Sequence, residues 1–145
     1  MFRGSYTTRI DEKGRLKLPS DFKRIVEEQY GAKFYLTSED GKAAQIWPMS
    51  EWEKKEAQLA LIPDMDPLKK KLMVRLNAYG REVEMDGQGR ILIHPRLREK
   101  ANLSDDVMVL GQYKYLEVVN LEAHEKSLEM DWTDEERSKL AGYGV

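Results

Sequence analysis

Two short segments carry the residue types best suited to chemistry, and they share one pattern. Residues 11–15 read Asp-Glu-Lys-Gly-Arg and residues 86–90 read Asp-Gly-Gln-Gly-Arg, 75 positions apart in a chain of 145. Each segment is followed by alternating apolar residues and then by a proline. A single Asp-x-x-Gly-Arg segment is a common turn, but two copies in the same context indicate an internal repeat.

The arginine that ends each segment has a chemistry suited to nucleic acid. A guanidinium can donate two hydrogen bonds to O6 and N7 of guanine, while nearby lysines can bind phosphates. A tight turn between two strands can place such side chains in a groove of DNA. We therefore predict that Arg15 and Lys13 bind DNA, together with Arg9, Arg3 and Gly14 close to them in the sequence.

The first segment is the more basic of the two. The second has Gln88 where the first has Lys13, and the strand before it contains two glutamates. We expect the first turn to be the main DNA reader. The second-repeat motif, with Asp86 and Arg90, is expected to be mainly architectural.

A structural role is an open alternative for both arginines. Arg15 follows Asp11 by four residues, close enough for an ion pair that fixes the turn, and the argument is stronger for Arg90 after Asp86. An aspartate at this position can accept hydrogen bonds from backbone N–H groups ahead of it, and the glycine can adopt a positive φ. We therefore predict that Asp11 structures the first turn.

The segments around the turns predict a β-rich fold with peripheral helices. Alternating apolar and β-branched residues indicate strands, and apolar residues three and four apart indicate helices. The predicted strands are 5–10, 16–18, 33–37, 43–47, 82–85, 91–93, 106–111 and 115–119, and the predicted helices are 19–30, 51–61, 68–79, 95–101 and 121–130. Each half thus reads strand, strand, helix, strand, strand, helix.

The repeat also predicts the organisation of the chain. We expect a first repeat over 1–62, a linker and connector helix over 63–79, a second repeat over 80–130 and an acidic tail over 131–145. Each repeat is too short to bury much core alone, so the two halves are predicted to pack together.

The charges are unevenly distributed around a net charge of −2. Residues 1–24 contain seven basic and three acidic side chains, whereas residues 120–145 contain three basic and seven acidic ones. The basic end is suited to a polyanion, although ordinary solvated surface is an alternative. The absence of cysteine excludes disulfides and thiolate chemistry and fits a reducing cytoplasm. No apolar run approaches membrane-spanning length, so we expect a soluble intracellular protein.

Catalysis is the chief rival class of function. Asp11 and Asp86 could be compared with an acid/base pair, but each lies beside an arginine, which lowers the pKa of a carboxylate. His94 and His124 do not make a metal cluster. We therefore expect no enzyme activity, no catalytic residue, no metal and no cofactor.

Several segments resemble the bacterial MraZ proteins. They are the opening Met-Phe-Arg-Gly and residues 11–19, 47–53, 85–90 and 109–112. The resemblance covers nearly the whole chain and is weakest after about residue 130.

This resemblance implies an α+β, β-rich fold of two AbrB-like swapped-hairpin β-barrel units in tandem with peripheral helices. It also implies a ring-shaped homo-oligomer in the cytoplasm, associated with the nucleoid and not with a membrane. The implied function is regulation of transcription through binding to double-stranded DNA. The sites would be short repeated G-rich boxes at the promoter of the division and cell-wall gene cluster, which includes the protein's own gene.

Two other functions stay open at this point. One is a scaffold or interaction module, and the other is an antitoxin, because the same barrel type occurs there. Antitoxins usually carry one barrel unit and a disordered tail, whereas this chain carries two units.

Overall fold

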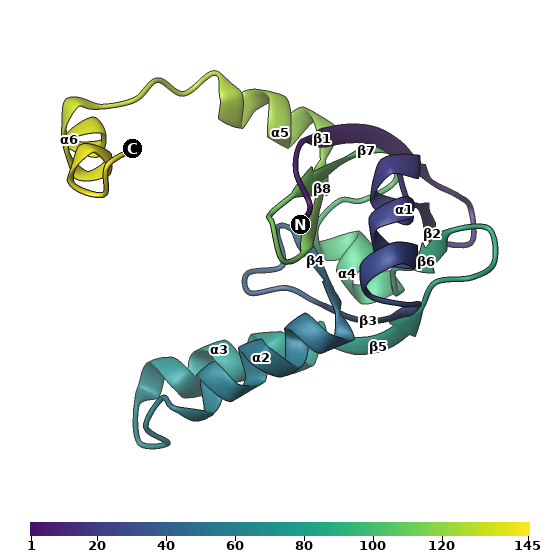
Figure 1. Cartoon of the computed structure of the whole chain (residues 1–145), viewed down its shortest axis with the longest axis horizontal. Helices are drawn as coiled ribbons and strands as arrows, with labels where there is room; N and C mark the ends of the chain where they lie inside the picture. Colours follow the sequence, from purple (N-terminus) through teal and green to yellow (C-terminus); the bar gives the residue numbers. More distant parts are fainter.

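The computed structural model describes all 145 residues, and its helices and strands repeat in order (Figure 1). The elements are β1 (Ser5–Ile10), β2 (Arg15–Lys17), α1 (Ser20–Gln29), β3 (Lys33–Thr37), β4 (Ala44–Pro48), α2 (Met49–Ala60), α3 (Pro67–Ala78), β5 (Arg81–Glu84), β6 (Arg90–Leu92), α4 (Pro95–Lys100), β7 (Asp105–Gly111), β8 (Leu116–Asn120), α5 (Leu121–Leu128) and α6 (Asp134–Gly142). The predicted order of strands and helices is confirmed in both halves, with α3 between them and α6 after them.

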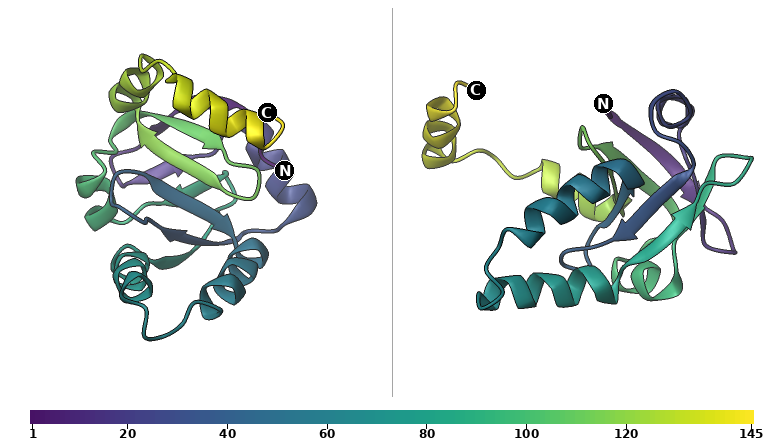
Figure 2. Two further views of the ribbon diagram at one scale, coloured as in Figure 1. Left: turned by 90° about the vertical axis from the view of Figure 1, so that its left-hand side faces the viewer. Right: turned by 60° about the horizontal axis from the view of Figure 1, so that its bottom comes forward.

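All eight strands belong to one antiparallel sheet with the order β5-β3-β4-β8-β7-β1-β2-β6. Strands of the two halves alternate in pairs along it, so neither half forms a sheet of its own. The end strands β5 and β6 are joined by the second turn, where Asp86 N–H donates to the carbonyl of Arg90 at 2.9 Å. This bond brings the two ends of the sheet together and nearly closes a barrel (Figure 2).

The predicted fold class is confirmed as α+β with tandem swapped-hairpin units, and the structure adds how the units combine. If β1 to β4 are exchanged with β5 to β8, the order of strands around the barrel is unchanged. The two repeats are therefore related by a pseudo-twofold axis. That axis passes through the pairing of β2 with β6, where Leu16 lies opposite Ile91, its equivalent 75 residues later.

The core lies inside this barrel and is shared by both repeats. Nineteen buried residues form one continuous cluster, and equivalent positions make equivalent contributions. Phe22 of α1 and Leu97 of α4, 75 residues apart, are both fully buried beside Leu16 and Ile91. Each such side chain stabilises the fold by about 1.5–3 kcal/mol relative to exposure. The halves pack together as predicted because neither can bury these residues alone.

Two elements project from the barrel (Figure 1). The antiparallel helices α2 and α3 form a hairpin with a small separate core of Trp47, Trp52, Leu59 and Leu76. The second projection is the C-terminal arm, which we define as residues 121–145 and which contains α5 and α6 (Figure 2). No helix in the protein combines the length and the apolar character needed to cross a membrane.

Candidate nucleic-acid interface

The first turn is held by the carboxylate of Asp11. Its Oδ1 accepts hydrogen bonds from the backbone N–H groups of Lys13 at 3.0 Å and Arg15 at 2.9 Å. Its Oδ2 accepts from Nε of Arg15 at 2.7 Å. Gly14 closes the turn with a φ of 84°, which favours a residue without a Cβ atom. The predicted turn-structuring role of Asp11 thus has a direct geometric basis.

The second turn repeats this geometry closely. Asp86 accepts from the backbone N–H groups of Gln88 and Arg90, both at 2.9 Å, and from Nε of Arg90 at 2.8 Å. Gly89 has a φ of 76°. The ion pair that was an alternative role for each arginine is therefore present in both turns.

These ion pairs leave the arginines able to bind a further partner. In both turns the nitrogen that meets the carboxylate is Nε, and neither Nη1 nor Nη2 of these arginines donates a hydrogen bond within the protein. Two guanidinium nitrogens are what a bidentate contact to guanine requires. Fixing the guanidinium through Nε also reduces the conformational entropy that binding would cost.

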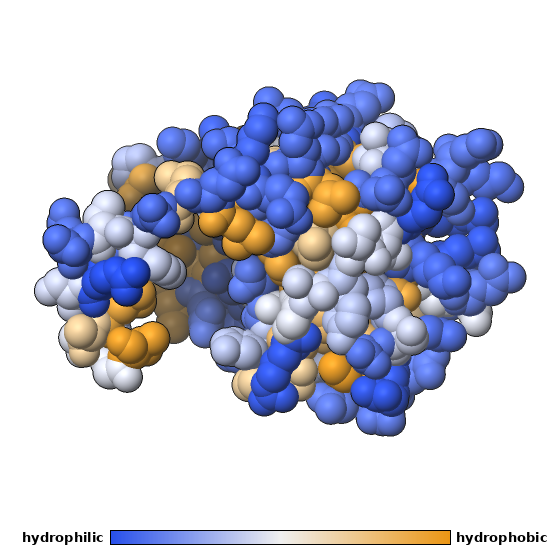
Figure 3. Space-filling view, turned by 90° about the horizontal axis from the view of Figure 1, so that it is seen from above, coloured by the Kyte–Doolittle hydropathy of each residue, from blue (hydrophilic) through white to orange (hydrophobic).

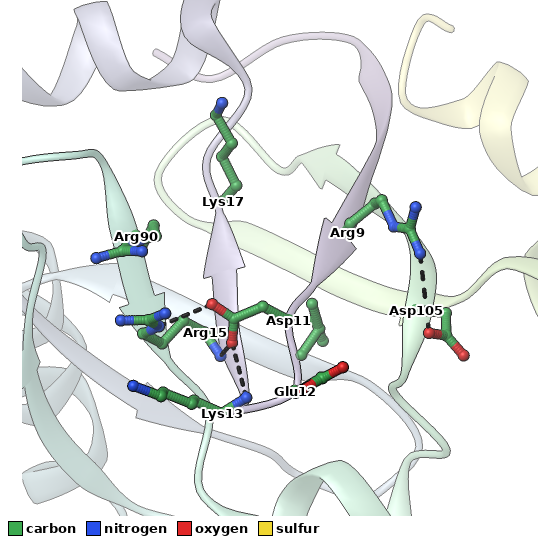
Figure 4. A pocket seen from close by; sticks show the side chains of 9 residues that line it. Arg9, Asp11, Glu12, Lys13, Arg15, Lys17, Arg90 and Asp105 are labelled. Atoms are coloured by element: carbon green, nitrogen blue, oxygen red, sulfur yellow. Dashed lines mark hydrogen bonds and ion pairs between the residues drawn. The ribbon is translucent and has the colours of Figure 1, made fainter.

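Basic side chains from both turns surround one open hollow of about 570 Å³ (Figure 4). Arg15 and Lys17 point to the same face of β2, since alternate residues of a strand share a face. Lys17 lies opposite Arg90 in the pairing of β2 with β6. The complete lining is Arg9, Ile10, Asp11, Glu12, Lys13, Arg15, Lys17, Arg90 and Asp105. The surface is therefore polar, solvent-open and rich in cations, like a site for a polyanion and unlike an apolar ligand pocket.

The structure brings most, though not all, of the predicted DNA-binding residues together. Lys13 is exposed at the tip of the first turn. Arg9 also lines the hollow, with weak, exposed ion pairs to Asp105 at 3.9 Å and Asp106 at 3.5 Å. Surface ion pairs of this kind contribute little and exchange readily for a phosphate.

Arg3 lies elsewhere. It follows Phe2, which bridges to Tyr113 at the far end of β1. Because β1 is extended, the six residue steps from Arg3 to Arg9 span roughly 20 Å. Proximity in sequence therefore does not place Arg3 beside the first turn.

Gly14 is buried, so its backbone conformation, more than an exposed surface, is what it adds to the site. A Cβ atom at this position would lie 2.6 Å from Nε of Arg98, which donates to the carbonyl of Ile93 at 2.7 Å. In the second turn a Cβ at Gly89 would lie 2.9 Å from Cδ of Lys23.

Three basic residues of this surface were not among the predicted site residues. Lys23 and Arg98 support the two turns and are themselves 75 residues apart, a signal that the repeat could have provided. Lys17 lines the hollow and lies two residues after Arg15, the spacing that places two strand residues on one face. Arg90, predicted to be mainly architectural, lies on the same surface as Arg15 because β2 and β6 are neighbours.

Both turn aspartates are held in the ionised form. The backbone N–H of Arg15 is the main cause that lowers the pKa of Asp11 below 3.8, helped by the guanidinium and opposed by partial desolvation. The backbone N–H of Arg90 lowers the pKa of Asp86 in the same way. A carboxylate with a lowered pKa is poorly suited to act as a general acid near neutral pH.

Comparison with known proteins agrees with this geometry. The profile of the MraZ protein family, whose description adds a likeness to antitoxins, matches residues 1–74 and 78–140. The chain belongs to the MraZ family.

Three MraZ relatives show the extent of the similarity, and each is named transcriptional regulator MraZ. The protein of Acidobacterium capsulatum is 54% identical over 146 residues and that of Koribacter versatilis is 46% identical over 147, each covering 100% of both chains. The protein of Shewanella oneidensis is 35% identical over 119 residues, covering 81% of this chain and 78% of its own. These relatives of the MraZ family are named as regulators of transcription and not as enzymes.

The glycines of the two turns provide a matched test of the geometry. Gly14→Ala would force a Cβ into Arg98 at a positive φ, so we expect a loss of roughly 1–3 kcal/mol in the free energy of unfolding. Gly87→Ala is the control, because a Cβ there meets nothing within 4 Å, and we expect a change within about 0.5 kcal/mol. Urea unfolding measures both. Equal effects of the two substitutions would contradict the proposed packing of Arg98 on the first turn.

The turn aspartates also predict a dependence of stability on pH. In the folded protein their pKa values are below the usual 3.8. Between the lowered values and 3.8, the unfolded chain therefore binds more protons than the folded protein does. Their contribution is complete above about pH 5, well above the pKa in the unfolded chain, and is lost as the pH falls through the lowered pKa values. Urea unfolding between about pH 6 and pH 2 should therefore show a weaker pH dependence for Asp11→Asn than for the wild type. An Asp11→Asn profile as steep as that of the wild type would refute the assignment.

Proposed function

We propose that this protein is a sequence-specific DNA-binding regulator of transcription, and that both turns contact the duplex. The observation that carries the proposal is the placement of Arg15 and Arg90 on one cationic surface, each bonded to its aspartate through Nε while Nη1 and Nη2 make no hydrogen bond within the protein. The family and the names of the relatives support the same class of function.

The residues around the hollow divide into two roles. Arg15 and Arg90 read guanine, which suits G-rich boxes, because their guanidinium groups are pre-oriented by Asp11 and Asp86. Lys13, with the neighbouring Lys17 and Arg9, binds phosphates and provides affinity that decreases as salt rises. In this proposal the second turn shares in reading, beyond the architectural role that its own sequence indicates.

One such surface is too small to give high affinity on its own, and assembly supplies the rest. A ring of copies presents several identical surfaces, which bind repeated boxes with an increased effective concentration. We place these boxes at the promoter of the division and cell-wall gene cluster that includes the protein's own gene. The protein then acts in the cytoplasm at the nucleoid, with each protomer supplying its two repeats, 1–62 and 80–130, as one binding unit.

The arginines are tested by DNA binding of single variants. Arg15→Ala and Arg90→Ala should each weaken binding to the DNA upstream of the gene by tenfold or more, since a good bidentate contact is worth roughly 1–3 kcal/mol. Lys114→Ala is matched in charge but lies in the turn between β7 and β8, at the end of the sheet away from the first turn, and should bind as the wild type. Fluorescence anisotropy over a range of salt concentrations measures these changes, and light scattering verifies that the oligomer is intact.

Other outcomes would assign another function. Unchanged binding by Arg15→Ala and Arg90→Ala would remove the turns from the interface. Wild-type protein that shows no salt-dependent binding to its upstream DNA would be a scaffold. Purification together with an unrelated small protein would favour an antitoxin, the likeness that the family's description adds.

The role of assembly is tested with DNA that carries either one box or several. The intact oligomer should prefer the multi-box DNA by roughly 10²–10⁴-fold, because the later contacts become intramolecular. A variant held as a monomer should lose this preference while it retains the weak affinity for one box. If the monomer binds multi-box DNA as tightly as the oligomer does, avidity has no part in recognition.

A further inference from the structure

The C-terminal arm leaves apolar side chains in solvent without a partner. Met130 is 80% exposed, Trp132 60% and Tyr143 84%, and Leu128 is also exposed. The hydrogen bonds and the ion pair of residues 129–145 all lie within residues 126–145. In Figure 3 the arm protrudes at the left with apolar groups on its surface. Exposed apolar groups gathered on one segment mark a surface for association.

The arm is nevertheless a defined structure. Thr133 and Glu136 form a reciprocal capping box at the start of α6. An isolated helix of nine residues is marginal in water, because nucleation is costly and packing supplies most of the stability of short helices. Helix α6 has a strong N-terminal cap but no packing partner in its own chain. Its stability therefore points to a packing partner outside the chain.

The helical hairpin offers a surface of complementary character. The segment that joins its helices and the outer side of α3 expose apolar groups, with Met65 93% and Leu68 72% exposed, and Val74 further along. Helix α3 has four basic residues and no acidic one, although Asp64 just before it pairs with Lys69. Lys70 and Lys71 are exposed; Lys71 lies three residues from both Leu68 and Val74, and Lys70 lies four residues before Val74. The arm carries seven acidic and three basic residues. The two surfaces thus match in both apolar content and charge.

We propose that the arm of one copy docks on the outer face of the α2–α3 hairpin of a second copy. Its apolar residues around Trp132 would cover Leu68 and Val74, and its carboxylates would lie against Lys70 and Lys71. This contact depends on self-association of the protein and is independent of DNA binding.

Two other docking positions for the arm agree less well with the structure. The cationic hollow at the turns could attract its charge, but only one apolar residue, Ile10, lines that hollow. The hairpin of the same chain extends to the same side of the barrel as α6, but the two are separated by a gap (Figure 1). A second copy brings the two surfaces together without such a constraint.

Cross-linking between chains tests the docking directly, because the native sequence contains no cysteine. Two single variants, Met130→Cys and Leu68→Cys, are mixed, reassembled and treated with a short bismaleimide. We expect a covalent dimer of one variant with the other. The matched control replaces Leu68→Cys by Tyr113→Cys, an exposed position between β7 and β8, and should give little product. A yield no higher than that of this control overturns the proposal. The proposal is also overturned if a double variant with both cysteines in one chain forms the cross-link only within that chain.

Charge exchange tests the proposed complementarity. In the variant that carries Leu68→Cys, the double substitution Lys70→Glu and Lys71→Glu should lower the cross-linking yield by about five-fold. This is the effect expected when two exposed ion pairs are lost. The double substitution Glu129→Lys and Asp131→Lys, made in the variant that carries Met130→Cys, should restore the yield. A yield that the hairpin reversal leaves unchanged overturns the proposal. Anisotropy with upstream DNA is measured in parallel on the wild type and Arg15→Ala, so that a failure of docking is distinguished from a failure of the proposed DNA-binding function.

Discussion

The pairing of β2 with β6 is the constraint on which the rest of the structure depends. It is the point where the two repeats meet as equivalents, and each turn is tied to the other repeat there. The carbonyl of Gly14 accepts from Ile93 N–H, and that of Gly89 accepts from Leu18 N–H, both at 2.9 Å. A shift of one residue in this register would move the buried apolar face outward and the cationic face inward. The same hydrogen bonds therefore fix the core and the surface that we assign to DNA.

This arrangement explains why an ion pair and a binding role are compatible in one arginine. Asp11 and Asp86 each use one oxygen for the backbone of the turn and the other for Nε of the arginine. The carboxylate thus shapes the turn and orients the guanidinium together. Several cations around one hollow repel one another, and the neighbouring carboxylates partly offset that cost in the absence of a polyanion.

The barrel leaves two elements that it does not need for its own core. The α2–α3 hairpin has its own small core, and the arm has none. Both present charge and apolar groups outward, and helix α3 of the hairpin is basic whereas the arm is acidic. Our two proposals therefore give the turns and the projections different roles, DNA binding for the turns and contacts between copies for the projections.

The sequence by itself determined the features that depend on a few neighbouring residues. The repeat, the order of strands and helices, and the Asp–Arg geometry of each turn could all be predicted, because alternation and short-range hydrogen bonds act within the segment that encodes them. Only the tertiary structure decided that the repeats interleave, that Arg90 joins Arg15, that Arg3 lies at the far end of β1, and that Arg98 covers Gly14. Those features depend on which strands pair across 75 residues, and that choice is made by burial of apolar residues from both halves together, which no single segment encodes.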